Sequence, residues 1–150
     1  MNRSDVQDPA DELAIRRLIV SGWGALDRKD WDAYAAAFAD DGEFEIFGQR
    51  RRGRAEIVAG RARDLAKYDA LQHLVMNELV EVDGDEASGR WYAVAIHVPD
   101  ATRPAEHADV GLRYTFRARR AADGWRFAEV RLEPLWTAGL SVVIEDPPES

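Results

Sequence analysis

The N-terminal part of the chain carries apolar residues at the spacing of α-helices. Asp8 followed by Pro9 predicts a helix start, because Asp caps the free N–H groups and Pro suits the first helical position. This helix is expected to end near Leu26. A shorter helix should follow Asp30, and a third should cover roughly residues 55–67. The first half of the chain is therefore predicted to be mainly helical.

Beyond residue 70 the pattern changes to alternating polar and apolar positions, which is typical of strands. Asp-Gly pairs mark two of the connecting turns. The predicted strands are 71–82, 87–98, 110–119 and 125–135. An earlier strand is expected at 43–47 after a turn at 40–42, and residues 50–54 are expected to form a loop. Three helices followed by a meander of antiparallel strands predict an α+β fold with a curved sheet around the helices.

The length of 150 residues fits one domain. We expect a single domain over residues 9–145, with flexible tails at 1–8 and 146–150. The N-terminal segment is polar and lacks the pattern of a signal peptide, and no apolar run approaches the ~20 residues of a membrane span. With no cysteine in the chain, a cytoplasmic protein without membrane contact is expected.

A formal net charge of −8 argues against nucleic acid as a partner, since such proteins need a basic surface. Arginines do cluster at residues 50–54 and again at 117–120. Acidic residues are interspersed among them, so we interpret both clusters as solvated loops and strand edges.

The strand predicted at 71–82 is apolar on both faces, which a sheet covered by helices on one side does not require. In a regular strand, one face would carry His73, Val75, Asn77 and Leu79, and the other Leu74, Met76 and Val80. The second apolar face predicts a homo-oligomer, a dimer or trimer formed through the outer face of the sheet.

Asp27 and His73 are the strongest candidates for chemistry. Asp27 lies at the end of the first predicted helix, and His73 lies at the start of a predicted strand. A carboxylate that hydrogen-bonds an imidazole orients the ring, fixes its tautomer and raises its basicity. Such a pair forms a general base without a cofactor. The three histidines lack the spacing of metal ligands, so no metal site is expected.

Three segments carry a resemblance to a known family. They are Asp-Arg-Lys-Asp-Trp-Asp at 27–32, Phe-Ala-Asp-Asp-Gly at 38–42 and Asp-Gly-Trp-Arg-Phe at 123–127. In this order they resemble the SnoaL-like family of the nuclear transport factor 2-like superfamily, including scytalone dehydratase and hexachlorocyclohexane dehydrochlorinase. The resemblance implies a cone-shaped, cystatin-like domain with a deep pocket between helices and sheet. It also implies catalytic roles for Asp27 and His73, and for His97 as a second histidine one strand later.

The resemblance implies a cofactor-independent lyase of the dehydratase type, or an isomerase or cyclase, acting on a small apolar, aromatic or polycyclic metabolite. His73 would be the base, Asp27 would orient it, and His97 would protonate a leaving hydroxyl. Because such pockets are largely apolar, further residues are expected to contact the substrate. These are Trp23, Phe47, Asn77, Trp91 and Tyr92.

The chain departs from these relatives at several positions. Where scytalone dehydratase has tyrosines that hold the substrate carbonyl, this chain has Leu26 and Phe47. The group that polarises a carbonyl is therefore missing or relocated. Gly22 and Val130 replace a lysine and an arginine of the dehydrochlorinase, and Ile46 replaces the base of ketosteroid isomerase.

Two alternatives remain open from the sequence. One is a non-catalytic ligand-binding or scaffold domain of the same fold, since a fold does not determine function. The other is an oligomerisation module attached to a larger complex, like the small subunit of aromatic-ring dioxygenases.

Overall fold

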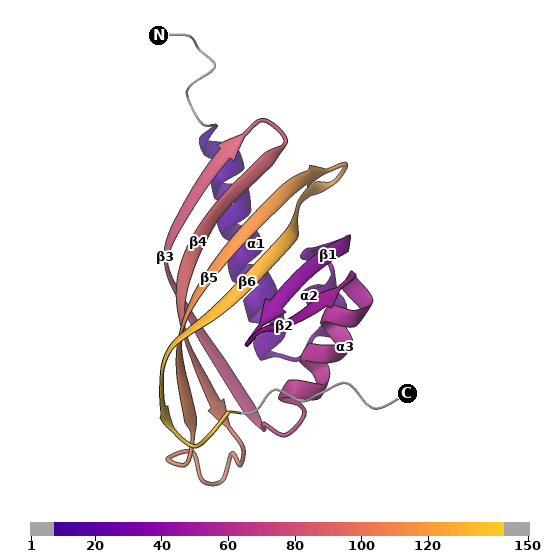
Figure 1. Ribbon diagram of the computed structural model, residues 1–150. Coiled ribbons are helices and arrows are strands. Elements are labelled where there is room, and N and C mark those ends of the chain that lie inside the picture. The colour runs from indigo at the N-terminus through magenta and orange to yellow at the C-terminus, as the bar shows by residue number, and fades with distance from the viewer. Residues whose placement is uncertain (1–7, 143–150) are drawn as a thin grey trace.

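Three helices lie against one face of a six-stranded sheet in the computed structural model, which describes residues 8–142 (Figure 1). The helices are α1 (Pro9–Asp27), α2 (Trp31–Ala35) and α3 (Arg54–Leu65). The strands are β1 (Phe38–Ile46), β2 (Gln49–Arg52), β3 (Ala70–Asp83), β4 (Glu86–Val98), β5 (Ala108–Ala121) and β6 (Gly124–Gly139). The tails expected at 1–8 and 146–150 lie outside the described residues, except for Asp8.

The strand order is β2-β1-β6-β5-β4-β3. Only the β1–β6 pair is parallel, and the other neighbours are antiparallel. The chain enters the sheet at β1 and β2, passes through α3 to the far edge at β3, and meanders back until β6 lies beside β1 (Figure 1). This arrangement confirms the predicted α+β fold with a curved, mostly antiparallel sheet.

The prediction for residues 40–54 was wrong in two ways. The turn expected at 40–42 lies inside β1, where the pairing with β6 shifts register between Phe38 and Glu43. The segment expected to be a loop forms β2, joined to β1 by a two-residue turn in which Phe47 (φ 46°) and Gly48 (φ 81°) both have positive φ. Such two-residue turns suit the twist of a hairpin.

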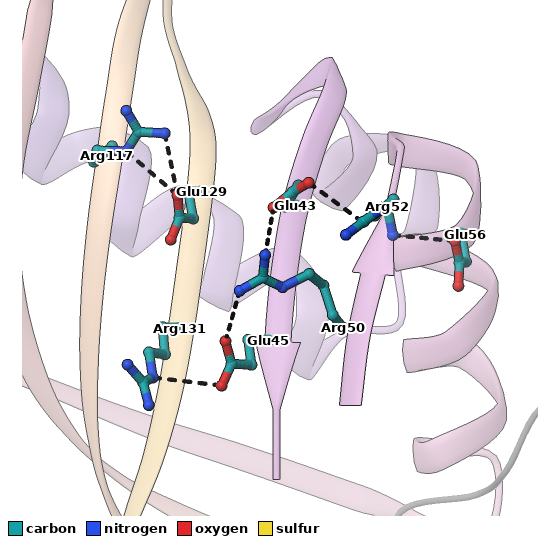
Figure 2. Close-up of polar contacts among 8 residues, drawn as sticks. All are labelled: Glu43, Glu45, Arg50, Arg52, Glu56, Arg117, Glu129 and Arg131. Atoms are coloured by element: carbon teal, nitrogen blue, oxygen red, sulfur yellow. Dashed lines mark hydrogen bonds and ion pairs between the residues drawn. The ribbon is translucent and has the colours of Figure 1, made fainter. Parts of the chain in front are cut away.

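The arginines of β2 explain why this strand was missed. Arg50 and Arg52 point outward and pair with glutamates of β1, whereas Arg51 points inward and is 4% exposed. The burial of successive arginines therefore alternates, but the strand contains no apolar residue, so the sequence shows no apolar alternation there. Figure 2 shows the outward pairs continuing across the sheet, from Arg131 to Glu45 at 3.5 Å and from Arg117 to Glu129 at 3.1 Å.

A β-bulge in β3 corrects the predicted assignment of its two faces. Asn77 has a φ of 56°, and the pairing with β4 shifts between Met76 and Leu79. Because the bulge adds one residue, every later residue of the strand points to the face opposite to the one predicted. Val80 is therefore buried on the same side as His73, and Leu79 is 44% exposed.

An aromatic cluster fixes α1 on the inner face of the sheet. Trp23 is 1% exposed, and its ring centroid lies 4.8 Å from that of Trp91 and 5.1 Å from that of Tyr114. Trp91 and Tyr114 stack across β4 and β5 at 4.7 Å. Buried aromatic groups contribute a large apolar area and prefer such edge-to-face and stacked geometries. Because Trp23 is one turn before Asp27, this packing also sets the position of the carboxylate.

The outer face of the sheet is divided in two. One part, over β1, β2, β5 and β6, carries the ion pairs of Figure 2. The other part is apolar and includes Leu74, Leu135 and Trp136, which are 43–48% exposed. Trp136 lies over Gly111, where a Cβ atom would come within 2.1 Å of the indole nitrogen. Among residues 8–142, no helix has the length and apolar character needed to span a membrane.

Candidate active site

The end of α1 is shaped to present Asp27 to the sheet. Lys29 has a positive φ of 54°, its N–H donates to Leu26 O, and the N–H of Asp30 donates to Ala25 O. These are the two hydrogen bonds of a Schellman motif, which ends a helix sharply. The Lys29 ammonium also donates to Tyr68 O at 2.6 Å, tying the helix end to the segment that leads into β3.

Both carboxylate oxygens of Asp27 contact His73. One oxygen accepts the backbone N–H of His73 at 2.8 Å, and the other lies 2.5 Å from Nδ1 of the ring. The His73 side chain is 1% exposed. Because a carboxylate only accepts, Nδ1 carries the ring proton and Nε2 is left with a free lone pair. An imidazole oriented in this way can act as a general base.

His73 lines a cavity between the sheet, α3 and the β1–β2 turn. The empty space between its walls is ≈ 360 Å³, and this figure includes the opening to solvent. The volume within which the centre of a water molecule can lie is only ≈ 20 Å³. The cavity is therefore narrow, with room for about one water. Its polar lining residues are His73, His97, Arg61, Asp64, Tyr68 and Tyr114. The rest of the lining is apolar and includes Phe47.

His97 lies beside His73 in a different environment. It is 5% exposed, its ring centroid is 6.2 Å from that of His73, and its Nδ1 is 3.3 Å from Ala108 O. Burial, and after it the neighbouring His73, lower its pKa to about 4. His97 is thus neutral at pH 7, with Nδ1–H donating to the carbonyl and Nε2 able only to accept.

An ion cluster that the sequence analysis missed forms another part of the lining. Arg51 donates to both oxygens of Asp64 at 2.8 and 3.1 Å, and Arg61 reaches the same carboxylate at 3.3 Å. All three side chains are at most 4% exposed. Gly60 makes room for Arg51, since a Cβ atom there would lie 2.5 Å from its Nε.

A signal for this cluster was present in the predicted third helix. Arg61 and Asp64 share a helical face with Ile57 and Leu65, which are both buried. Two charged residues on the apolar stripe of a helix indicate either a wrong helix or a buried ion pair.

The structure brings together only some of the expected site residues. His73, His97 and Phe47 line the cavity, and Asp27 contacts His73 without itself lining the cavity. The other expected contacts with substrate lie elsewhere. Trp23 and Trp91 belong to the aromatic cluster behind Tyr114 and do not reach the cavity wall.

Asn77 and Tyr92 are on the outer side of the sheet. Asn77 is exposed at the bulge, so it does not share the face of His73 as a regular strand would require. Tyr92 follows the buried Trp91 and therefore points the other way, toward Arg113. Within residues 8–142, no three histidine or acidic side chains converge as metal ligands would.

The helices, the mixed sheet and the interior cavity define an α+β domain of the cystatin-like, nuclear transport factor 2-like class. The family model described as a SnoaL-like domain matches residues 7–131, so this chain belongs to the SnoaL-like family. This confirms the resemblance read from the sequence. None of the proteins of curated function matches the chain.

Solved structures with the same fold include three of particular interest. A scytalone dehydratase-like protein from Novosphingobium aromaticivorans is 21% identical with a TM-score of 0.80, over 92% of this chain and 93% of the other. A type 2 hexachlorocyclohexane dehydrochlorinase is 20% identical with a TM-score of 0.73, over 94% and 99%. A protein with a cystatin-like fold, also from N. aromaticivorans, is 26% identical with a TM-score of 0.72, over 84% and 82%.

The buried, neutral state of His97 predicts a specific pH dependence of stability. Folding lowers the pKa of His97 from 6.5 to about 4, so in this window the unfolded chain binds a proton that the folded protein does not. The free energy of unfolding should be highest above pH 6.5 and decrease toward pH 4 by about 3 kcal/mol. Urea unfolding across this range measures the slope. The variant His97→Asn should have a flatter profile, and equal slopes would contradict the prediction.

Proposed function

We propose that this protein is a cofactor-independent acid–base lyase of the dehydratase type, or an isomerase or cyclase, acting on a small apolar metabolite with an aromatic or polycyclic skeleton. The observation that carries the proposal is the contact of Asp27 with the His73 ring, which lines a narrow and largely apolar cavity. Binding of such a substrate requires side chains of the lining to move apart, because the cavity as it stands holds about one water. Two structural relatives have names that denote loss of water and of hydrogen chloride, which supports an elimination.

In this mechanism His73 Nε2 removes a proton from a carbon next to a carbonyl group. The C–H electron pair moves into the carbonyl system to form an enolate, and Asp27 stabilises the imidazolium that results. The enolate then expels a hydroxide from the neighbouring carbon as a C=C bond forms. The imidazolium returns its proton to that hydroxide, which leaves as water. Delivery of the proton to another carbon gives isomerisation instead.

The environment of His97 does not favour the role of proton donor that was expected for it. A pKa of about 4 leaves no proton on its free nitrogen at neutral pH. We propose that Nε2 of His97 accepts a hydrogen bond from a substrate hydroxyl and orients it. His73 then supplies the proton for the leaving group.

The proposal predicts that Asp27 and His73 are both required for proton removal. General acid–base assistance contributes ~10²–10⁴-fold, so Asp27→Asn and His73→Gln should lose about this factor. The measurement is exchange of the α-protons of a bicyclic aromatic ketone such as 2-tetralone with D₂O, followed by NMR. β-Hydroxy ketones of the same class are then screened for formation of the conjugated product by ultraviolet absorbance.

The chain offers a matched control in a second Asp–His pair. His107 Nδ1 lies 2.7 Å from Asp109, on a half-exposed side chain outside the cavity lining. His107→Gln should exchange protons at the wild-type rate. Exchange by the wild-type protein no faster than by His73→Gln would contradict the proposal and favour a non-catalytic ligand-binding domain.

We also propose that the chain forms a homo-oligomer through the apolar part of the outer sheet face. Leu74, Leu135 and Trp136 expose apolar area there, and burying it against a second copy is favourable. Analytical ultracentrifugation should show a dimer or trimer that Trp136→Glu dissociates. Arg117→Ala, on the charged part of the same face, should leave it intact. A monomeric wild-type protein would contradict this proposal.

A further inference from the structure

Arg61 is the least satisfied member of the buried ion cluster. Arg51 makes two hydrogen bonds to Asp64 at 2.8 and 3.1 Å, whereas Arg61 makes one at 3.3 Å through Nη1. The Nε atom of Arg61 is buried and has no acceptor among the residues described. The better geometry belongs to Arg51, so the carboxylate compensates Arg61 only in part.

The charges of this cluster do not cancel. Two buried guanidinium groups share one buried carboxylate, which leaves one net positive charge beside the cavity. A buried charge is costly unless it is paired. An anionic oxygen in the cavity would supply both the missing charge and an acceptor.

The field of Arg61 already acts on neighbouring oxygen atoms. Burial raises the pKa of Tyr114, and the positive charge of Arg61 opposes that rise. The same opposition is present at Tyr34. Burial still raises the pKa of both tyrosines on balance, so Arg61 reduces the cost of an oxyanion at this position without making it the favoured form of either tyrosine.

Arg61 and His73 line the same cavity from opposite elements, α3 and β3. The proposed reaction needs a group that binds the carbonyl oxygen of the substrate. We propose that Arg61 takes this role: its guanidinium binds the substrate carbonyl oxygen and stabilises the enolate formed when His73 removes the adjacent proton. This inference rests on the proposed function and adds the electrophilic group to it.

The charge that develops in the reaction is equal and opposite to the net charge of the cluster. Proton transfer to His73 converts a neutral carbonyl oxygen into one carrying a single negative charge, and one net positive charge is available at Arg61. Preorganised donors of this kind stabilise charge that develops in a transition state. The inferred substrate class is a neutral ketone, with a hydroxyl group on the carbon beyond the acidic one where water is lost.

The test uses 4-nitrophenol, because its phenolate resembles an enolate and absorbs visible light while the neutral phenol does not. Titrating the probe into the protein over a range of pH gives the affinity of each form and the apparent pKa of the bound probe. The wild-type protein should bind the phenolate preferentially and lower this pKa relative to the free probe. Arg61→Met should reduce phenolate affinity by about 10- to 100-fold, the range expected for a hydrogen bond to a charged group.

Arg61→Met should still fold, because Asp64 keeps both hydrogen bonds from Arg51 and no charge is left unpaired. Arg61→Lys keeps the charge and should retain part of the preference. Arg17→Met removes a surface charge from α1 and should bind like the wild type. His73→Gln tests whether an imidazolium, rather than the guanidinium, holds the phenolate.

Each outcome bears on one of the two proposals. Phenolate preference that persists in His73→Gln and is lost in Arg61→Met supports the role of Arg61, whether or not proton exchange is observed. The role of Arg61 would be overturned by any of three results. The wild-type protein binds the neutral phenol preferentially, it binds neither form, or the preference for phenolate is lost only in His73→Gln. If Arg61→Met does not fold, Arg61→Lys takes its place: full wild-type preference in Arg61→Lys would overturn the role of the guanidinium, and a reduced preference supports it. Proton exchange that depends on His73 supports the proposed function independently.

Discussion

The carboxylate of Asp27 joins two parts of the molecule that are 46 residues apart in the sequence. One oxygen accepts the backbone N–H at the start of β3, and the other accepts the ring of the same residue. The first bond fixes where β3 begins relative to α1, and the second fixes how the imidazole is turned. Position and orientation of His73 thus depend on one side chain. That side chain depends in turn on the packing of Trp23 one helical turn earlier.

The second constraint is the buried charge on the other side of the cavity. Arg51, from the short β2 strand, fills the space above Gly60 and holds Asp64. Asp64 in turn keeps the guanidinium of Arg61 beside the cavity. Ion pairs of this kind stabilise a fold weakly, because desolvation offsets most of the attraction. The role proposed for Arg61 would account for their presence in a small domain.

The spacing of apolar residues was enough to predict the helices and the four long strands, because each of these elements buries one face. It was not enough for β2, where every residue of the strand after Gln49 is an arginine. Nor does a pattern of period two reveal where a bulge interrupts it, so Asn77 and the residues after it were assigned to the wrong face. The meeting of Asp27 and His73 was expected from a family resemblance. Arg61 and Asp64 were overlooked because charged residues on a predicted helix are usually taken as solvated.

The bulge at Asn77 marks a division inside the molecule. Toward the β3–β4 hairpin, the space between α1 and the sheet is filled by the aromatic cluster, and the packing there is solid. Toward Leu71 and His97 the interior contains the narrow cavity, whose lining includes several polar groups. The packed core and the cavity therefore lie at different ends of the same strands. Substitutions of residues that line only the cavity can therefore change its shape and charge while the aromatic cluster keeps its packing.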